Sequence, residues 1–376
     1  MNLNLSLTEI LKEYKKNQNS HLLKESIDLL DVNHKNILML FLERKIPVLK
    51  DDVWFLIQNI SLEQNDSSQQ NTLDYFLKHY SPVYNWFDSE QIHYLFEHTS
   101  IHPLSLSQAF YGCKENNLEL EKKHWELLLE PIQKIQKTKI HYGDKALYQF
   151  LKTSKTPNFE QHWIDILLEH ANLNILDSNN RSFFDVAVYY RKNLSIKHWN
   201  QLLAHHDFNK VIYHEYNTLI MSLKSRKINR LPVEIAQAII LNTSLELENK
   251  SFNNKIHNPR NPILLGLEEK VFINILQQLF QAGFSIQNTK PKALEPIFIK
   301  ISHGLSTIQN KEDSIARFHY LFSQIPSNII ETTIYNIENY PKLTDNMRKI
   351  KPLYLSYLIQ RNLPEPSKNI IKNHKI

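Results

Sequence analysis

The sequence predicts an all-α protein, an α-solenoid of helical-pair repeats that ends in helical caps. Three observations carry this prediction: a His-Trp motif recurs at nearly even spacing, weaker apolar motifs extend the series, and only five of the 376 residues are glycine. Glycine usually makes up about 7% of a protein, so folds that need glycine-rich turns are disfavoured. A solenoid grows by adding repeats and needs no central core, so this chain length suits it.

The recurring motif places His-Trp before a run of leucine and isoleucine. It occurs at His124-Trp125, His162-Trp163 and His198-Trp199. The tryptophans are 38 and 36 positions apart, and each motif has apolar residues at i, i+3 and i+4, which is typical of an amphipathic helix. One such helix cannot bury its apolar stripe alone, so we expect each to pack against a neighbour.

Weaker copies of this motif extend the series toward both ends of the chain. A large apolar residue recurs at Trp54, Tyr94, Trp125, Trp163, Trp199, Ile235, Leu276 and Tyr320, at steps of 31 to 44 residues. One helical pair per about 30 to 45 residues lies within the range of solenoid repeats.

A second motif lies between these helices: a small or polar residue followed by leucine or another apolar residue. It predicts the start of the first helix of each pair. The motif covers residues 71–74, 102–106, 145–148, 182–187, 217–221, 261–264 and 292–295. Ankyrin repeats carry their Thr-Pro-Leu-His motif at this place, and the resemblance to that family begins here.

The segment 162–203 resembles an ankyrin repeat most clearly. Residues 166–174 are similar to the second ankyrin helix and its exit, 177–181 to the turn, and 182–188 to the next first helix. A second match, at 279–287, keeps the turn glycine as Gly283. The resemblance covers about residues 50–325 and implies degenerate ankyrin-like repeats. Because the repeat length varies and the other units lack that glycine, a plain helical hairpin is the alternative for each unit.

The flanks of the repeats predict helical caps. Ser6 and Glu9 form the Ser-x-x-Glu pattern of a helix start. The predicted domains are an N-terminal helical cap at 1–48, ankyrin-like repeats at 49–325, a C-terminal helical cap at 326–366 and a disordered basic tail at 367–376. Two polar stretches, 65–70 and 248–262, predict surface loops.

Composition disfavours several classes of site. No GxxxxGK[ST] or GxGxxG phosphate-binding pattern occurs. Cys113 is the single cysteine, which excludes an internal disulfide and a cysteine-based zinc cluster. No signal-peptide pattern and no apolar stretch of about 18 residues is present. We therefore expect a cytoplasmic protein with no membrane partner, and the abundance of Lys, Asn and Ile indicates a bacterial source.

Histidines and the cysteine are the candidates for chemistry. In a regular solenoid His124, His162 and His198 would form a column, but adjacent repeats lie about 10 Å apart, too far to share one metal ion at about 2.1 Å. We expect instead a structural role, a histidine at a helix start beside a buried tryptophan. Cys113 lies in no known nucleophile motif. No catalytic residue, metal or cofactor is expected.

Basic residues form small clusters, although the net charge is only +5. The clusters are Lys224, Arg226, Lys227 and Arg230; Arg348, Lys349 and Lys351; and the tail residues Lys368, Lys372 and Lys375. Together on one face they would meet phosphates or an acidic surface. Solvated helix ends are the simpler explanation, so we do not expect nucleic acid as the partner.

A solenoid presents one long concave surface, which usually binds another macromolecule. We expect a non-catalytic protein-protein interaction scaffold, either a bacterial effector delivered into a host cell or an immunity protein that neutralises a toxin. The candidate contact residues precede first helices: Asn179, Asn180, Arg181, Tyr213, His214, Glu215 and Tyr216. The alternatives are an enzyme whose site is assembled from dispersed residues and a nucleic-acid binder that uses the basic clusters.

Overall fold

The computed structural model shows a helical chain divided into two compact units, Met1–His206 and Asp207–Ile376. It describes residues 6–81, 87–134, 141–153, 156, 158–190, 193–210, 212, 216–224, 226–245, 261–286, 290–306, 308–340 and 343–361. Within these residues all regular secondary structure is helical, and the one extended contact is an isolated bridge between Ile212 and Tyr216. The predicted all-α class is confirmed.

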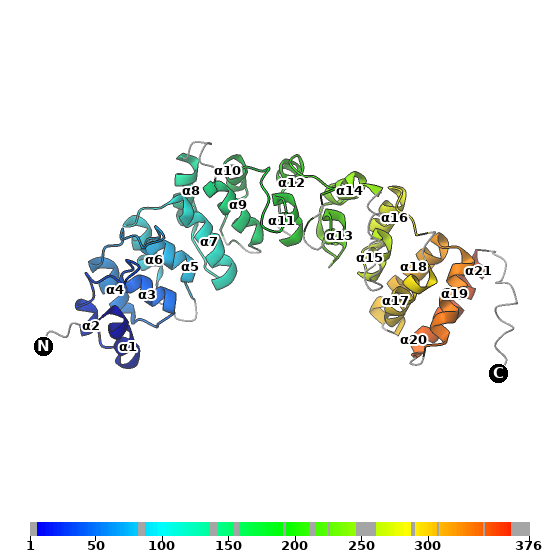
Figure 1. Cartoon of the computed structure of the whole chain (residues 1–376), viewed down its shortest axis with the longest axis horizontal. Helices are drawn as coiled ribbons and strands as arrows, with labels where there is room; N and C mark the ends of the chain where they lie inside the picture. Colours follow the sequence, from blue (N-terminus) through cyan, green and yellow to red (C-terminus); the bar gives the residue numbers. More distant parts are fainter. Residues whose placement is uncertain are drawn as a thin grey trace. The chain divides into compact units, whose positions relative to one another are not determined.

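The first unit is built from short helices joined by turns (Figure 1). They are α1 (Leu7–Asn17), α2 (His21–Lys24), α3 (Ile37–Arg44), α4 (Lys50–Asn59), α5 (Thr72–His79), α6 (Ser89–Glu97), α7 (Pro103–Asn116), α8 (Lys122–Lys134), α9 (His141–Lys152), α10 (Trp163–Glu169), α11 (Phe183–Tyr190) and α12 (Ile196–Leu203). The predicted helix start at Ser6 is confirmed, because Ser6 and Glu9 form a capping box at α1.

Helices of the first unit pack in two rows. The first helices, α3, α5, α7, α9 and α11, contact one another in order, and so do the second helices, α4, α6, α8, α10 and α12. The rows meet where α7 contacts α8, α9 contacts α10 and α11 contacts α12. In Figure 1 α8, α10 and α12 lie above α7, α9 and α11. Each helix thus buries its apolar stripe against its partner and against the same row of the next pair.

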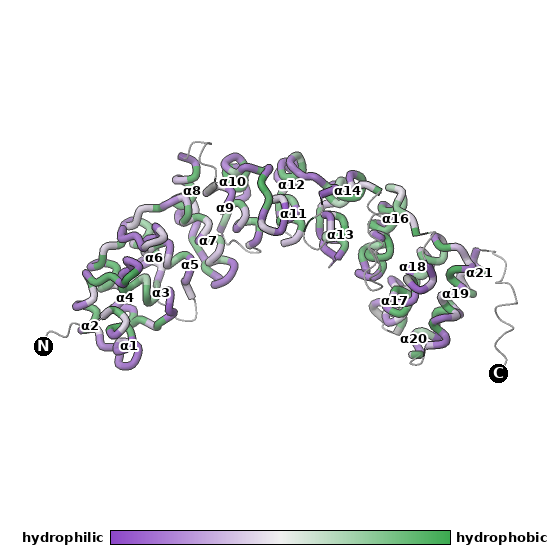
Figure 2. The backbone as a smooth tube through the Cα atoms, in the orientation of Figure 1, coloured by the Kyte–Doolittle hydropathy of each residue, from purple (hydrophilic) through white to green (hydrophobic). Residues whose placement is uncertain are grey.

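Aromatic side chains fill the space between the rows. Trp125 of α8 and Trp199 of α12 are fully buried. Trp125 stacks on Phe110 of α7 with ring centroids 5.2 Å apart, and Trp199 meets the edge of Phe184 of α11 at 5.7 Å. Along the tube of Figure 2, hydrophobic and hydrophilic residues alternate within each helix, as expected for helices with one buried face.

Three turns that precede first helices share one hydrogen-bond pattern. They begin at Asp31, Asp66 and Asp177. In each, the aspartate side chain accepts the backbone N–H groups two and four residues later, at 2.8 and 2.9 Å. The residue three positions after the aspartate is left-handed, with φ of 60° at His34, 59° at Gln69 and 63° at Asn180. Positive φ is uncommon outside glycine. Its recurrence at the same position of all three segments therefore indicates one recurring turn.

A buried polar residue caps the first helix that follows each of these turns. The caps are Asn36, Asn71 and Ser182, all nearly inaccessible to solvent. The Asn71 Oδ1 atom accepts the N–H of Asp74 at 3.0 Å, while Nδ2 donates to the Ser100 carbonyl at 2.8 Å, in the segment that leads to α7. Asn36 likewise caps α3 and donates to the Ser61 carbonyl before α5. One amide therefore both starts a helix and joins it to the next connector.

The second unit is also built from paired helices. They are α13 (Thr218–Leu223), η3 (Lys227–Arg230), α14 (Val233–Asn242), α15 (Pro262–Glu268), α16 (Ile273–Gln281), α17 (Pro291–Ser302), η5 (His303–Ser306), α18 (Ile308–Gln324), α19 (Ser327–Glu338), α20 (Asp345–Arg348) and α21 (Ile350–Gln360). Here α13, α15, α17 and α19 contact one another in order, and α14 contacts α16. Asn261 repeats the bridging cap, because it caps α15 and donates to the Ser285 carbonyl at 2.8 Å.

Two sequence expectations can be compared with the structure here. Residues 65–70 form a non-helical surface turn with residues 67–69 exposed, as predicted, and the buried Asp66 organises this turn. Trp54 and Tyr94 do not occupy the buried place of Trp125: they are half-buried and pack edge to face at 5.8 Å. The buried stripe of α4 runs instead through Val53 and Leu56, since apolar spacing alone does not define which side of a helix meets its neighbours.

Three other predictions concern a domain boundary, a loop and the tail. The boundary between the two units, at 206/207, falls inside the predicted repeat array 49–325. Most of the predicted loop 248–262 lies outside the described residues, and Pro262 begins α15. The predicted tail 367–376 also lies outside them.

Replacing a bridging cap should destabilise the first unit. For Asn71→Ala we expect a loss of about 1–3 kcal/mol in the free energy of unfolding, because Asp74 N–H and the Ser100 carbonyl both lose a buried partner. Urea titration followed by circular dichroism measures it. The matched control is Asn59→Ala, an exposed asparagine that bonds only to the carbonyl of Phe55 within its own helix, with an expected change below about 0.5 kcal/mol. Equal losses for both variants would contradict the bridging role.

Candidate interaction surface

The predicted contact residues Asn179, Asn180 and Arg181 form the third of the aspartate turns. Asn180 is exposed and Asn179 partly exposed. The Arg181 side chain is mostly buried, with 11% of it exposed, and its Nε donates to Asp177 Oδ2 at 2.8 Å. The turn therefore leaves Asn180 and part of Asn179 accessible to solvent, while Arg181 packs against Asp177.

Side chains of α9 and α11 extend this surface. The Tyr148 hydroxyl donates to Asp177 Oδ2 at 3.0 Å, and Lys152 Nζ lies 4.9 Å from the centre of the Tyr148 ring. Tyr189 is 41% exposed and lies beneath the Arg181 guanidinium at 5.5 Å. Tyr190 packs on Tyr189 with ring centroids 4.9 Å apart. We call Tyr148, Lys152, Arg181, Tyr189 and Tyr190 the tyrosine–cation cluster.

Charges within and beside the cluster perturb one another. Burial acts to raise the pKa of Asp177, but hydrogen bonds from the Arg181 side chain and backbone outweigh it, so the pKa lies below its ordinary value. Burial lowers the pKa of Lys152, and the positive charges of Lys114 and Arg181 lower it further. Tyr148 is shifted upward in pKa by burial and then by its bond to Asp177. The aspartate is ionised and compensates the arginine, whereas Lys152 sits in an unfavourable field.

The sequence contained a signal for the tyrosines. Asp144 and Asp185 are buried at the starts of α9 and α11, and a tyrosine follows each after four residues, at Tyr148 and Tyr189. The shared Asp-x-x-x-Tyr spacing places both tyrosines in the same register of neighbouring helices. Lys152 follows Tyr148 by one helical turn. Arg181, in contrast, reaches these rings only because the turn folds onto them.

The remaining predicted contact residues belong to the second unit. Tyr213, His214 and Glu215 lie outside the described residues. The Tyr216 backbone carbonyl accepts the Ile212 N–H at 2.7 Å. Its hydroxyl accepts from Lys224 Nζ at 3.0 Å, and that ammonium lies 4.6 Å from the ring centre. Tyr216 thus makes the same kind of lysine contact as Tyr148.

A polar depression between α10 and α12 is the second candidate. It measures about 420 Å³ and is shallow and open. Ser195 Oγ lies 2.9 Å from His198 Nδ1, and His198 Nε2 lies 3.2 Å from Asp165 Oδ1. A hydroxyl, an imidazole and a carboxylate in this order are the groups of a nucleophilic site. Enzymatic chemistry therefore has one concrete candidate.

Helix capping accounts for the same three contacts. Ser195 caps α12, where its Oγ accepts the His198 N–H at 3.4 Å. Lys197 Nζ holds Asp165 Oδ1 at 2.8 Å, and this hydrogen bond is the main reason that the pKa of Asp165 is lowered. At α8 the equivalent histidine, His124, accepts the Glu121 N–H at 3.3 Å without any serine. Because the histidine returns where no nucleophile is present, we interpret His198 as a cap.

The three His-Trp histidines have different surroundings. His124 and His198 are buried at the starts of α8 and α12 beside buried tryptophans, as expected. His162 is 63% exposed and faces Glu160. His124 stacks on Phe96 at 4.5 Å, and burial lowers its pKa to about 4. Among the described residues, no group of three or more His, Cys, Asp or Glu side chains is arranged to hold a metal ion.

The other sequence candidates lie in different surroundings. Cys113 is buried in α7. Of the first basic cluster, Lys227 is buried, and in the second cluster Arg348 bonds to Asp345 and Lys351 to Glu338. The tail lysines lie outside the described residues. Along the described chain, none of the helices has both the length and the apolar character that a membrane span requires.

Comparison with known proteins adds no family. Neither a family model nor a curated protein matches the sequence. The ankyrin-like resemblance therefore rests on this chain's own motifs and turns.

His124 should make stability depend on pH. Its pKa is about 4 in the folded chain against 6.5 for the unperturbed side chain, so the unfolded chain binds more protons between these values. Stability is therefore complete above about pH 6.5 and falls as the pH drops toward 4, by about 1–2 kcal/mol at pH 5. Urea titrations at pH 7.5 and 5 measure this loss.

A variant separates this titration from helix capping. His124→Gln keeps an acceptor at the place that Gln91 occupies in α6, where Gln91 accepts the Asp88 N–H, and should reduce the loss at pH 5. The exposed His98, replaced in His98→Gln, is the control and should leave it unchanged. The same pH dependence in wild type and His124→Gln would contradict the assignment.

The cap interpretation of Ser195 is open to a chemical test. Ser195→Ala should lower the free energy of unfolding by about 1 kcal/mol, and Ser195→Asp should largely preserve it, because aspartate also caps helices. A fluorophosphonate probe, followed by peptide mass spectrometry, should leave Ser195 unlabelled. Labelling that disappears in His198→Gln would instead identify a nucleophilic serine.

Proposed function

We propose that the chain is a non-catalytic scaffold, an α-solenoid of degenerate ankyrin-like repeats that binds a protein partner. The observation that supports it is the recurrence of one turn, with the same hydrogen bonds and the same left-handed position, before α3, α5 and α11. Asp31 and Asp66 are 35 residues apart, and Asp177 follows after 111, which equals three steps of 37. Turns that recur at nearly constant spacing and have exposed tips are typical of solenoids that bind other molecules.

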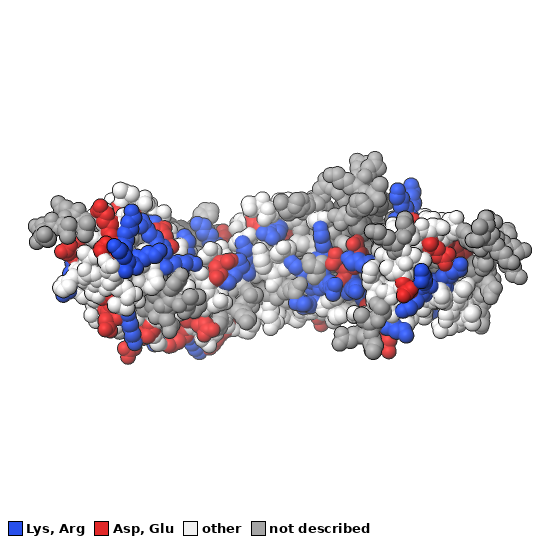
Figure 3. All heavy atoms as spheres, turned by 90° about the horizontal axis from the view of Figure 1, so that it is seen from below, with Lys and Arg blue, Asp and Glu red and all other residues white. Residues whose placement is uncertain are grey.

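The binding face in this proposal is formed by the turn at Asp177 and the neighbouring first helices α9 and α11 of the first unit. The turn at Asp177 presents Asn179 and Asn180, and the neighbouring first helices present Tyr148 and Tyr189. Tyrosine and arginine are enriched at the energetic centres of protein interfaces. Figure 3, which views the first-helix side, shows acidic and basic side chains interspersed, as suits a protein partner better than a uniform polyanion.

A pull-down tests the proposal. Tagged protein is incubated with lysate of the source organism and of a candidate host, and bound material is washed at about 0.3 M salt, which screens weak surface contacts. We expect one stoichiometric protein, identified by mass spectrometry. A host protein would indicate an effector and a toxin would indicate an immunity protein. Recovery of nucleic acid alone, or of nothing, would contradict the scaffold.

Matched variants localise the binding. Ser178→Glu with Asn179→Glu places two charges on the tip of the turn at Asp177 without touching its hydrogen-bonded aspartate, and should abolish capture at an unchanged melting temperature. Ser67→Glu with Ser68→Glu makes the same change in the turn at Asp66, where both serines are exposed, and should retain capture. Loss in neither pair would place the partner elsewhere.

A further inference from the structure

One cation of the tyrosine–cation cluster, Lys152, has no ion-pair partner within the part of the chain that the structure describes. Arg181 is paired with Asp177, and Lys114, which lies close enough to affect Lys152, is paired with Glu115. Lys152 forms no ion pair among the described residues, and its contacts are the faces of Tyr148 at 4.9 Å and Tyr190 at 5.9 Å. A cation over aromatic faces is oriented and partly desolvated. Its positive charge is therefore held in place without a direct ion pair to a described carboxylate.

The chain contains a matched arrangement in which the charge is compensated. Lys35 Nζ lies 5.4 Å from the centre of the Tyr75 ring, beside the turn at Asp66. It also bonds to Glu43 of α3 at 2.7 Å. The contact between lysine and tyrosine is thus the same, but the carboxylate is supplied by the chain itself. At Lys152 that carboxylate is missing from the described residues.

We propose that Lys152 binds a carboxylate from an acidic segment of a protein partner, with a neighbouring partner side chain packed on the exposed ring of Tyr189. This rests on the proposed function of binding a protein. The carboxylate takes the place that Glu43 has beside Lys35, and removes the repulsion that Lys114 and Arg181 exert on Lys152. Tyr189 adds a large, exposed aromatic contact next to it, of the kind that dominates interface energies.

Local charge favours an acidic peptide over a nucleic acid. Asp177 and Glu115 lie within the electrostatic reach of Lys152, so a continuous row of phosphates would meet two carboxylates as well as the cations. A peptide carries its charges on separate, adjustable side chains and places one carboxylate at one ammonium. The site therefore suits an acidic segment with apolar residues between its charges.

Fluorescence anisotropy with defined peptides tests the assignment. The probe is a fluorescein-labelled peptide of eight residues that alternates glutamate and leucine, and its counterpart carries glutamine instead of glutamate. We expect the full-length protein to bind the glutamate peptide more tightly, and Lys152→Met and Tyr189→Ala each to weaken it by at least about fivefold. Lys35→Met, the matched control, should leave the affinity unchanged. Circular dichroism melting verifies that the variants are folded.

Several results would overturn the assignment. They are equal binding of the two peptides, equal losses in Lys152→Met and Lys35→Met, and tighter Lys152-dependent binding of a labelled single-stranded oligonucleotide. The pull-down distinguishes this failure from failure of the scaffold itself. If wild type and Lys152→Met capture the same protein equally well, the scaffold function stands and the acidic-segment site is wrong.

Discussion

Buried amides at the starts of first helices join consecutive helical pairs. Asn71 accepts the Asp74 N–H within its own helix and donates to the Ser100 carbonyl of the next connector, and Asn36 and Asn261 make the same two kinds of bond. A buried amide is costly unless its hydrogen bonds are made. Because both sides of the side chain are satisfied only in one register, each amide fixes where a helix begins and where the next helical pair must lie.

Buried polar residues other than these amides lie near the starts of the two helices that carry the candidate surface. Asp144 and Asp185 are buried near the starts of α9 and α11. Tyr148 and Tyr189, four residues later, therefore occupy equivalent positions on these neighbouring first helices. The turn at Asp177 packs beside these tyrosines. Arg181 lies over the ring of Tyr189, and Lys152 lies over the ring of Tyr148. A candidate surface of this kind needs no cavity, because adjacent helical pairs contribute its side chains.

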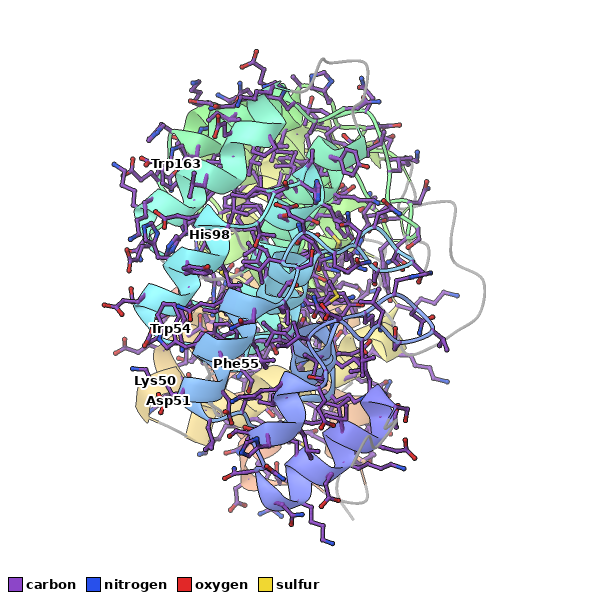
Figure 4. The ribbon with its side chains drawn as sticks, turned by 90° about the vertical axis from the view of Figure 1, so that its left-hand side faces the viewer. Lys50, Asp51, Trp54, Phe55, His98 and Trp163 are labelled. Carbon is purple, nitrogen blue, oxygen red and sulfur yellow. The ribbon has the colours of Figure 1, made fainter. Side chains whose placement is uncertain are left out.

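Helix capping and nucleophilic catalysis use the same residue types. At the depression beside α12, it is the structure that distinguishes these two roles. Ser195, His198 and Asp165 have the distances of a nucleophilic site, yet His124 accepts a cap hydrogen bond in the same place of α8. The second helices carry a further ladder, in which Lys50 pairs with Asp88 and Lys122 with Glu160. Figure 4 labels Lys50 and Asp51 at the start of α4. Because similar contacts recur along the row of second helices, we interpret them as contacts that join neighbouring helical pairs.

Helical periodicity and the Ser-x-x-Glu pattern by themselves determined the all-α class, the helix start at Ser6, and the burial of Trp125 and Trp199, because these depend on residues within one helix. Only the tertiary structure decided that Trp54 faces Tyr94 rather than the core, and that Gln69 takes a left-handed turn without glycine. It also decided the tyrosine–cation cluster, whose members come from two helices and a turn. Contacts between residues more than 30 positions apart depend on how each helical pair is rotated against its neighbour. The spacing of apolar residues within one helix carries no information about that rotation.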